Sequence, residues 1–520
     1  MNQIMKNNLY LFFLLTVITT PIIFQSCDDE AIPAYIAFDP YEYASLDEDG
    51  GTWNPNLLTS PSQIGIPSPT AVNSAEYQAE LSALKNASAQ LTGEQAEAVE
   101  YWAGDGLVRW NEIARELAAK YNLAPAPDSA GNYPAPNPAN PGKYPLFPFA
   151  HPPYASRAFA YWATTQYDAL IATWYHKYTF NRPAPYATDA TIVTHLPKNA
   201  LPSYPSDGAV IAAVSLASLT ALFPLEKDFL IAKATEHKNS LMWAGVNVQS
   251  DITAGDSLGR AVWKVFQGRL ASDGFKFAQT PRPISDSIRD NAQARLGWHW
   301  ENQETPPRPV GITPLFGKVK LWNVPNVLDV RPGPPPHPDS LEFQPYAQEL
   351  RDIADNLTKD QRRIANFWSD GLGTYTPAGH WNRFASNEII KNRLNPLRAA
   401  RVFAYLNMAM GDAGIACWDA KYYYHYPRPI QAIPGFKTIL GTPNFPSYTS
   451  GHSTFSYAAS EVMSHFFPDD AGIFTAYADE ASISRVYAGI HYRFDIEAGK
   501  QAGLQVGEYT LNVAIVDGGE

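Results

Sequence analysis

The chain has long stretches in which hydrophobic residues recur at the three- and four-residue spacing of an amphipathic α-helix. This spacing is plain in residues 75–123, 156–178, 341–370 and 397–421, where each helix would have one apolar and one polar side. The strict alternation of hydrophobic and polar residues that is typical of β-strands is scarce. The pattern therefore predicts an all-α fold.

The chain also resembles itself. A shift of 244 residues places the sequence of 157–161 (RAFAY) on that of 401–405 (RVFAY), and a shift of 266 aligns positions further upstream, so the first copy carries an insertion of 22 residues. The proline-rich run 124–153 is the natural place for this insertion. Further aligned pairs are Asp168 with Asp412, Trp174 with Trp418, Lys177 with Lys421, and residues 202–206 with 446–450. We therefore predict two related helical bundles packed together.

Composition and charge narrow the range of partners. The 520 residues, 45% of them hydrophobic, are enough to bury a large core. The formal net charge of −12 argues against a nucleic-acid surface or an acidic membrane surface as partner. The chain has two cysteines, Cys27 and Cys417, so we expect no disulfide framework, and we expect Cys417 to be packed inward within its helical stretch.

The N-terminus has the pattern of an export signal. Lys6 precedes an apolar run at 9–24 that contains Pro21 and is short for a membrane span of about 20 residues. Cys27 follows this run and is itself followed by the acidic residues 28–30, an order that resembles a bacterial lipoprotein signal. We expect Cys27 to be the lipidated first residue of an exported protein, anchored to the outer membrane on its periplasmic side or at the cell surface. An uncleaved anchor and an ordinary signal peptide are the alternatives.

Side chains suited to a tetrahedral oxyanion are concentrated in the last hundred or so residues. They fall in three stretches, KYYYHYPRP from Lys421, FPSYTSGH from Phe445 and SRVYAGIHYRFD from Ser484. Cationic side chains neutralise an oxyanion, while hydroxyl and backbone N–H groups donate directed hydrogen bonds to it. The candidates are Lys421, Arg428, Ser450, Gly451, His452, Arg485 and His491.

Asp495 is the carboxylate that belongs to this group. It lies four residues after His491, so on a helix the two side chains share one face and the carboxylate can hold the imidazole in one tautomer. We interpret His491 as a nucleophile or ligand supported from behind, the alternative being a hydrogen-bonded surface pair. His425 and His465 lie outside the three stretches, and we interpret them as structural or surface residues.

The three stretches, in this order and at compatible separations, resemble the vanadium-dependent haloperoxidases and, more distantly, the type 2 phosphatidic acid phosphatase superfamily that shares their site. The resemblance implies vanadate as cofactor. It also implies that Lys421, Arg428 and Arg485 bind its equatorial oxygens with help from Ser450 and the Gly451 amide, that His491 is the apical ligand of vanadium, and that His452 is the general acid or base.

Trp418 and Phe445 extend this resemblance to the chloroperoxidase type. Trp418 lies one helical turn before Lys421, and Phe445 precedes the Ser-Gly-His turn. The resemblance implies that these two residues line the haloperoxidase pocket. The alternative is that both are ordinary aromatic residues of the core.

Two enzyme classes fit the site. The first is a haloperoxidase that oxidises halide with hydrogen peroxide to a hypohalous species, with vanadate as a Lewis acid and Lys421 as the main polarising cation. The alternative is an acid phosphatase, in which His491 attacks phosphorus to form a phosphohistidine and His452 protonates the leaving oxygen. A third hypothesis is a lipid-anchored protein that binds an oxyanion without turnover. The expected partners are small molecules: peroxide, halide, an organic acceptor or a phosphomonoester.

The first unit differs from the second where this chemistry would take place. At the shift of 244 residues, His452, Arg485 and His491 face Gly208, Leu241 and Asn247. We therefore predict that the first unit is a structural partner and that the active site lies in the C-terminal bundle. The expected organisation is a signal peptide at 1–26, an extension at 27–70, a first helical unit at 71–303, a proline-rich crossing segment at 304–343 and a catalytic helical unit at 344–520.

Overall fold

A computed structural model of the chain describes residues 39–304 and 307–520. Cys27 and the predicted signal peptide lie outside these residues. The described part is all-helical and contains no β-strand. No helix in this part is long and apolar enough to cross a membrane.

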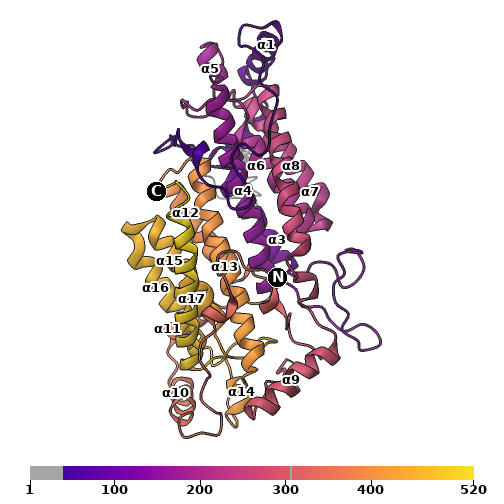
Figure 1. Cartoon of the computed structure of the whole chain (residues 1–520), viewed down its shortest axis with the longest axis vertical. Helices are drawn as coiled ribbons and strands as arrows, with labels where there is room; N and C mark the ends of the chain where they lie inside the picture. Colours follow the sequence, from indigo (N-terminus) through magenta and orange to yellow (C-terminus); the bar gives the residue numbers. More distant parts are fainter. Residues whose placement is uncertain (1–38, 305–306) are drawn as a thin grey trace, which may run out of the picture. The chain divides into compact units, whose positions relative to one another are not determined.

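The helices fall into two groups along the chain (Figure 1). The first group consists of α1 (Ala75–Ala89), α2 (Gly93–Ala103), α3 (Gly106–Tyr121), α4 (Pro152–Phe180), α5 (Pro185–Thr188), α6 (Asp207–Leu222), α7 (Lys227–Trp243), α8 (Gln249–Ser272) and α9 (Arg282–Leu296). The second consists of α10 (Gln344–Asp355), α11 (Lys359–Phe367), α12 (Thr376–Lys391), α13 (Pro396–Tyr424), α14 (Pro429–Ala432), α15 (Gly451–Phe466), α16 (Ala471–Tyr487) and α17 (Arg493–Ala514). Short 3-10 helices lie at Gly50–Thr52, Pro224–Glu226, Phe275–Phe277, Phe316–Lys318, Val327–Val330 and Pro468–Asp470.

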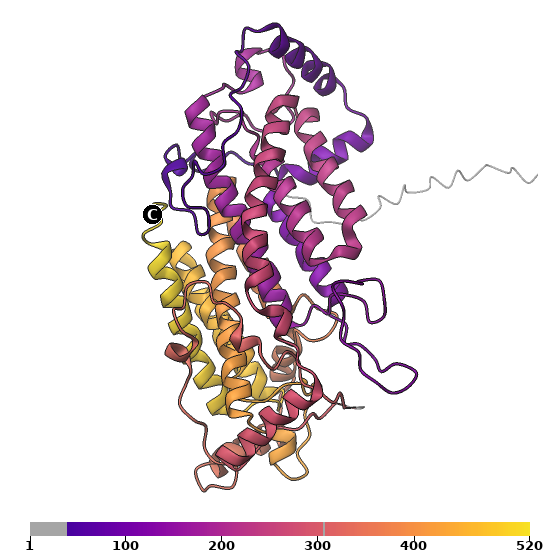
Figure 2. The same ribbon diagram turned by 45° about the vertical axis from the view of Figure 1, so that its right-hand side comes forward.

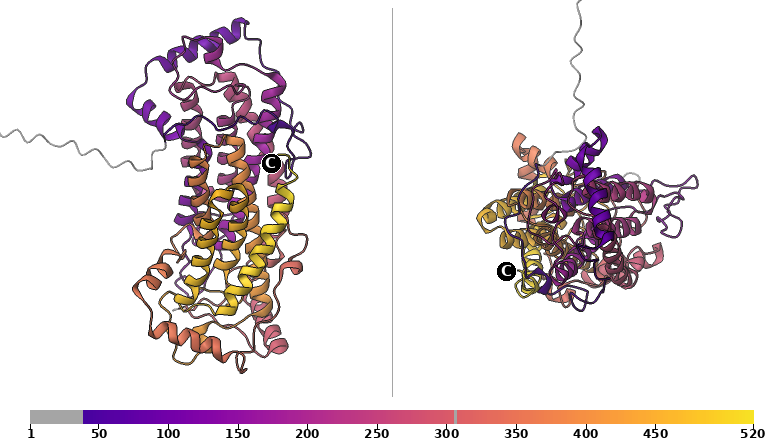
Figure 3. Two further views of the ribbon diagram at one scale, coloured as in Figure 1. Left: turned by 90° about the vertical axis from the view of Figure 1, so that its left-hand side faces the viewer. Right: turned by 90° about the horizontal axis from the view of Figure 1, so that it is seen from above.

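Two long helices, α4 and α13, form the centre of the fold and pack against each other (Figures 1 and 2). Each has 29 residues, most of them buried, begins with proline in its first turn and ends at a left-handed residue, Asn181 or His425. Proline fits the first helical turn because its missing N–H has no partner there in any case. Helices α6 and α8 pack on α4, whereas α15 and α17 pack on α13, as Figure 3 shows for the yellow C-terminal helices.

The helix bounds repeat between the two groups. Helices α4, α6, α7 and α8 begin at residues 152, 207, 227 and 249, and α13, α15, α16 and α17 begin 244 residues later, at 396, 451, 471 and 493. The connection before α4 spans residues 122–151, whereas the one before α13 spans only 392–395. This agreement in length and spacing supports the two-unit interpretation, although the predicted domain boundaries remain a prediction.

Some predicted periodic stretches contain more than one helix. Residues 75–123 form three helices because Thr92 and Asp105 each accept backbone N–H groups at a helix start and so begin a new helix. Thr358 likewise separates α10 from α11, through a capping box with Gln361. Periodicity located the apolar faces, and the capping residues set the breaks between helices.

On each central helix, a buried carboxylate accepts hydrogen bonds from the backbone of an extended segment. Asp412 on α13 accepts hydrogen bonds from the backbone N–H groups of Trp322, Asn323 and Val324, at 2.7 to 3.0 Å. Asp168 on α4 accepts them from residues 56, 57 and 58, at 2.7 to 2.9 Å. The crossing segment is thus held against the second bundle by a carboxylate that has a counterpart in the first.

Candidate active site

The candidate residues of the three stretches converge at one end of the second bundle. Lys421 lies in the last turn of α13, Arg428 precedes α14, Ser450 caps α15, Arg485 lies in the last turn of α16, and His491 lies just before α17. The site is therefore built from helix ends and from the loops between them.

Lys421 is fully buried beneath the loop that precedes α15. Its Nζ atom donates to the backbone carbonyl oxygens of Pro446, Ser447 and Thr449, at 2.8, 2.8 and 2.5 Å. Burial, with a smaller effect from Arg428, lowers the pKa of Lys421 to about 7. The three carbonyl acceptors match the three N–H bonds of an ammonium group, so they favour the charged form and oppose the effect of burial.

Arg428 is also fully buried and lies against the imidazole of His491. Its Nε atom donates to the Phe445 carbonyl oxygen at 3.1 Å, and NH1 donates to the Ile490 carbonyl oxygen at 2.8 Å. NH1 also lies 3.0 Å from Nε2 of His491. The NH2 group has no hydrogen-bond partner within the described residues, and burial lowers the pKa of Arg428 to about 10. A buried, unpaired guanidinium N–H group is costly unless a ligand accepts from it.

His491 has one defined tautomer. Its Nδ1 atom lies 2.8 Å from Oδ2 of Asp495, and Asp495 also accepts from the Ser447 hydroxyl at 2.5 Å. Burial, followed by the charges of Arg428 and Lys421, lowers the pKa of His491 well below its usual value. The neutral ring therefore donates from Nδ1 to the carboxylate, and the lone pair of Nε2 faces the cations.

His452 is held by a carboxylate that the sequence analysis did not identify. Its Nε2 atom lies at an ion-pair distance of 3.3 Å from Oδ2 of Asp370, and Oδ1 of the same carboxylate accepts from Nδ1 of His380 at 3.1 Å. Burial acts to raise the pKa of Asp370, but the two neighbouring imidazoles hold it well below the usual value. Burial and the charge of Arg485 lower the pKa of His452 to about 4, so this imidazole is neutral at pH 7.

The remaining oxyanion candidates complete the wall of the site. Arg485 is 1% exposed and donates from NH2 to the Ala365 carbonyl oxygen at 3.1 Å, and burial lowers its pKa to about 10. Ser450 caps α15, whose first residue is Gly451. A Cβ atom added to Gly451 would meet only Sγ of Cys417, at 3.9 Å, so the space beside this amide is open to a ligand.

Trp418 and Phe445 form an aromatic pair next to the cations. Their ring centroids are 4.9 Å apart, and Nε1 of Trp418 donates to the Ile312 carbonyl oxygen at 3.1 Å. Lys421 and Arg428 both lie over the Phe445 ring, at 5.1 and 5.2 Å from its centroid. Trp418 is fully buried, as a core aromatic would be, whereas Phe445 is partly exposed beside the cations.

The other singled-out residues lie outside this cluster. Cys417 is buried, as expected, and has no disulfide partner within the described residues. His425 ends α13 in a left-handed conformation and accepts from the Trp300 N–H. His465 forms an ion pair with Glu520 at 3.1 Å. These contacts agree with structural or surface roles for the two histidines.

The residues present fit an oxyanion bound through one imidazole. The charges of three buried cations, Lys421, Arg428 and Arg485, act on the imidazole of His491, and the NH2 group of Arg428 has no partner among the described residues. Burial lowers the pKa of all three cations, which is the cost of burying positive charge without a counter-ion. A bound vanadate or phosphate would offset this cost.

Comparisons with known proteins show what the segment around these residues is similar to. Residues 402–513 match the model of the PAP2 superfamily, and this segment contains the candidate residues from Trp418 to Asp495. The chain is 27% identical over 105 residues to the vanadium chloroperoxidase of Curvularia inaequalis. That match covers 16% of this chain and 17% of the relative, so it spans only about a sixth of the curated protein.

The fold is similar to solved structures over much greater lengths. A bacterial vanadium-dependent iodoperoxidase, 25% identical, superposes with a TM-score of 0.54 and covers 69% of this chain and 91% of its own. The holo form of a bacterial vanadium-dependent chloroperoxidase, 16% identical, superposes with a TM-score of 0.50 and covers 75% and 98%. Residues 402–513 therefore match the PAP2 superfamily, and the chain around them has a helical fold similar to that of the vanadium-dependent haloperoxidases.

Proposed function

We propose that this protein is a vanadate-dependent haloperoxidase, which oxidises halide with hydrogen peroxide. The observation that carries the proposal is the neutral His491, whose Nε2 lone pair faces buried cations while Nδ1 is held by Asp495. The Trp418–Phe445 pair beside the cations and the similarity to a bacterial iodoperoxidase favour oxidation over phosphate hydrolysis.

Most of the site residues would hold the cofactor, and His452 would transfer a proton. Nε2 of His491 would be the ligand to vanadium, and Lys421, Arg428 and Arg485 would neutralise the oxygens together with Ser450 and the Gly451 amide. Bound vanadate supplies a Lewis acid that activates peroxide toward halide without a change in oxidation state.

His452 is the proton acceptor in this proposal. Its imidazole is neutral at pH 7 because burial and Arg485 lower its pKa to about 4. With Nε2 turned toward Asp370, Nδ1 is the nitrogen that can take a proton from hydrogen peroxide. A neutral imidazole suits this step better than the protonation of a leaving group, which the phosphatase alternative requires.

The acid phosphatase is still the alternative, because the PAP2 match covers both chemistries and the lone pair of His491 also suits attack on phosphorus.

Export and the lipid anchor at Cys27 likewise remain predictions from the sequence.

A paired assay separates the two reactions. We expect iodide or bromide oxidation that requires both vanadate and hydrogen peroxide, and no release of phosphate from a phosphomonoester in the absence of vanadate. His452→Ala is expected to lower oxidation roughly a hundredfold, within the usual range for general acid–base catalysis, while vanadate still binds. Phosphate release that vanadate inhibits, without halide oxidation, would favour the phosphatase. Vanadate binding without either activity would favour a binding protein.

Asp370→Asn is expected to shift the pH dependence of oxidation. The carboxylate raises the pKa of His452 against burial, so its removal lowers that pKa further. The pH at which activity falls on the acidic side then moves lower. The loss of orientation is expected to reduce kcat about tenfold. The measurement is kcat against pH, with Asp355→Asn, on the exposed end of α10, as the control. An unchanged acidic limb would limit Asp370 to a structural role.

A further inference from the structure

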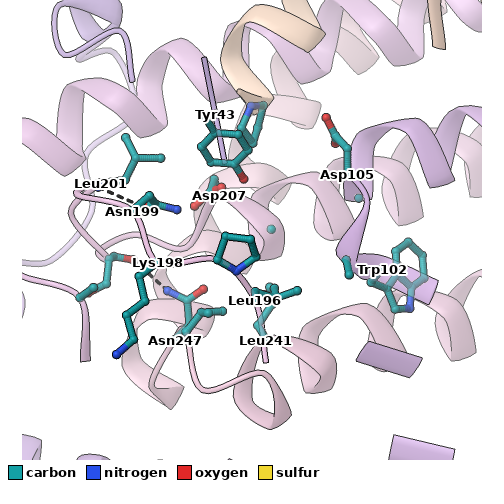
Figure 4. A pocket seen from close by; sticks show the side chains of 18 of the residues that line it. Tyr43, Trp102, Asp105, Leu196, Lys198, Asn199, Leu201, Asp207, Leu241 and Asn247 are labelled. Atoms are coloured by element: carbon teal, nitrogen blue, oxygen red, sulfur yellow. Dashed lines mark hydrogen bonds between the residues drawn. The ribbon is translucent and has the colours of Figure 1, made fainter. Parts of the chain in front are cut away.

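The first bundle contains a cavity of about 140 Å³ at its own set of helix ends (Figure 4). Its walls include Lys177, Gly208, Leu241 and Asn247, which lie 244 residues before Lys421, His452, Arg485 and His491. Helix α5, beside this cavity, lies at the opposite end of the fold from α14 (Figure 1). Helix α14 is next to the candidate active site, which we call the anion site here. The cavity is thus the first bundle's counterpart of the candidate active site.

The charges in this cavity differ from those of the anion site. Nζ of Lys177 lies 3.0 Å from Oδ1 of Asp207 and donates to the Pro202 carbonyl oxygen at 2.6 Å, so its charge is already neutralised. The nearby Arg182 is paired with Asp251 in the same way. Among the described residues that line the cavity, none therefore offers a free buried cation to an oxyanion.

A buried carboxylate in the wall has no cationic partner among the residues that the structure describes. Asp105 is 9% exposed and caps α3, where Oδ1 accepts from the Leu107 N–H at 2.7 Å. The backbone N–H of Val108 also lowers its pKa by hydrogen bonding, and the Tyr41 hydroxyl donates to Oδ2 at a long 3.5 Å. Burial, with a further effect from the charge of Asp207, raises the pKa of Asp105 to about 7. A cation bound beside this carboxylate would favour its ionised form.

An unpartnered hydrogen-bond donor faces the same space. His237 is 2% exposed, its ring stacks on Trp102, and Nδ1 accepts from the Trp110 indole N–H at 3.1 Å. Burial lowers the pKa of His237 to about 3, so the neutral ring carries its hydrogen on Nε2. No described residue accepts from this N–H. A Cβ atom added to Gly208 would lie 3.5 Å from Nε2, which places the donor where the second bundle carries His452.

Aromatic side chains cover the cavity from the N-terminal segment. Tyr41 and Tyr43 line it, and Tyr43 points toward Asp207 in Figure 4. The Tyr43 hydroxyl has no hydrogen-bond partner among the described residues. The exposed Lys198 at the rim lies over the Tyr186 ring, 5.6 Å from its centroid. The faces of aromatic rings attract ammonium groups, and a nearby carboxylate adds a charge-assisted hydrogen bond.

We propose that this cavity binds a small organic ammonium compound that also carries a hydroxyl or carbonyl oxygen. The ammonium group would lie at Asp105 and the aromatic rings, and the oxygen would accept from Nε2 of His237. The volume is close to that of an engineered cavity of about 150 Å³ that holds benzene, so a ligand of about six non-hydrogen atoms fits. This proposal is independent of the reaction at the second bundle.

The test compares three probes of similar size and different charge. Isothermal titration calorimetry of the full chain would use 4-aminobutan-1-ol as cation, butane-1,4-diol as neutral compound and 4-hydroxybutyrate as anion. We expect one binding site for the amine and at least about tenfold weaker binding of the other two, because a charge-assisted hydrogen bond is lost. Excess vanadate is not expected to displace the amine.

Asp105→Asn isolates the carboxylate, because asparagine caps a helix about as well as aspartate. We expect at least about tenfold weaker binding of the amine and unchanged binding of the diol. Glu94→Gln, which removes an exposed carboxylate on α2, is the matched control. Asp207→Asn leaves Lys177 without its partner and is expected to strengthen binding of 4-hydroxybutyrate. Failure of the amine to bind, stronger binding of the anion, or unchanged affinity in Asp105→Asn would each overturn the proposal.

Discussion

His491→Ala is expected to abolish halide oxidation and to weaken vanadate binding by at least about a thousandfold, or about 4 kcal/mol. The imidazole offers a neutral nitrogen whose lone pair faces buried cations, 3.0 Å from NH1 of Arg428. Its removal takes away a direct ligand to the metal, whereas the cations supply only electrostatic attraction. It also leaves Asp495 as a buried carboxylate without the imidazole that donates to it at 2.8 Å.

The measurement is vanadate affinity by equilibrium dialysis together with the oxidation rate at saturating peroxide and halide. His465→Ala is the control, because this histidine lies on α15 but forms an ion pair with Glu520 away from the site. A thermal unfolding curve establishes that the variant is folded. Retained oxidation in folded His491→Ala would remove this histidine from the reaction, and with it the proposed function.

The residues around His491 could be predicted because they lie in short motifs at loops and helix ends. His491 and Asp495 are four residues apart, so a single helix start places them together. Asp370 could not be found in this way. It lies far upstream, between α11 and α12, and reaches His452 only because these helices pack near α15 and α16. Nothing in its surroundings, Trp-Ser-Asp-Gly, distinguishes it from an ordinary turn.

The positions of the helices could be predicted better than the contacts between them. Periodicity and the 244-residue shift located the paired helices, because both depend on local sequence. The sequence did not predict the cavity of the first bundle. The aligned positions Gly208, Leu241 and Asn247 showed only that the first bundle lacks the histidines and the arginine of the second. The segment with Tyr41 and Tyr43 that covers it has no helical pattern, and only the three-dimensional arrangement brings it to the cavity.

Asp168 and Asp412 lie 244 residues apart, and we expect both carboxylates to stabilise the fold. Each occupies the same position on its central helix and accepts three backbone N–H groups from a segment that lacks regular structure. Burial raises the pKa of both to about 6, so both are mainly ionised at pH 7. Backbone N–H groups in an extended segment need a hydrogen-bond acceptor, which a neighbouring strand supplies in a sheet. Here the two carboxylates supply it.

Asp412→Ala is therefore expected to lower the free energy of unfolding by about 3 to 5 kcal/mol, because three backbone N–H groups of the crossing segment lose their acceptor. Asp412→Asn keeps one acceptor oxygen and is expected to cost about half as much. Asp168→Ala is expected to match Asp412→Ala to within about 1 kcal/mol. Chemical unfolding at pH 7 measures all three, with Glu100→Ala on an exposed face of α2 as the control. A loss below about 1 kcal/mol for Asp412→Ala would mean that the crossing segment is held by its other contacts, such as the Ile312 carbonyl oxygen with Trp418 and Tyr422.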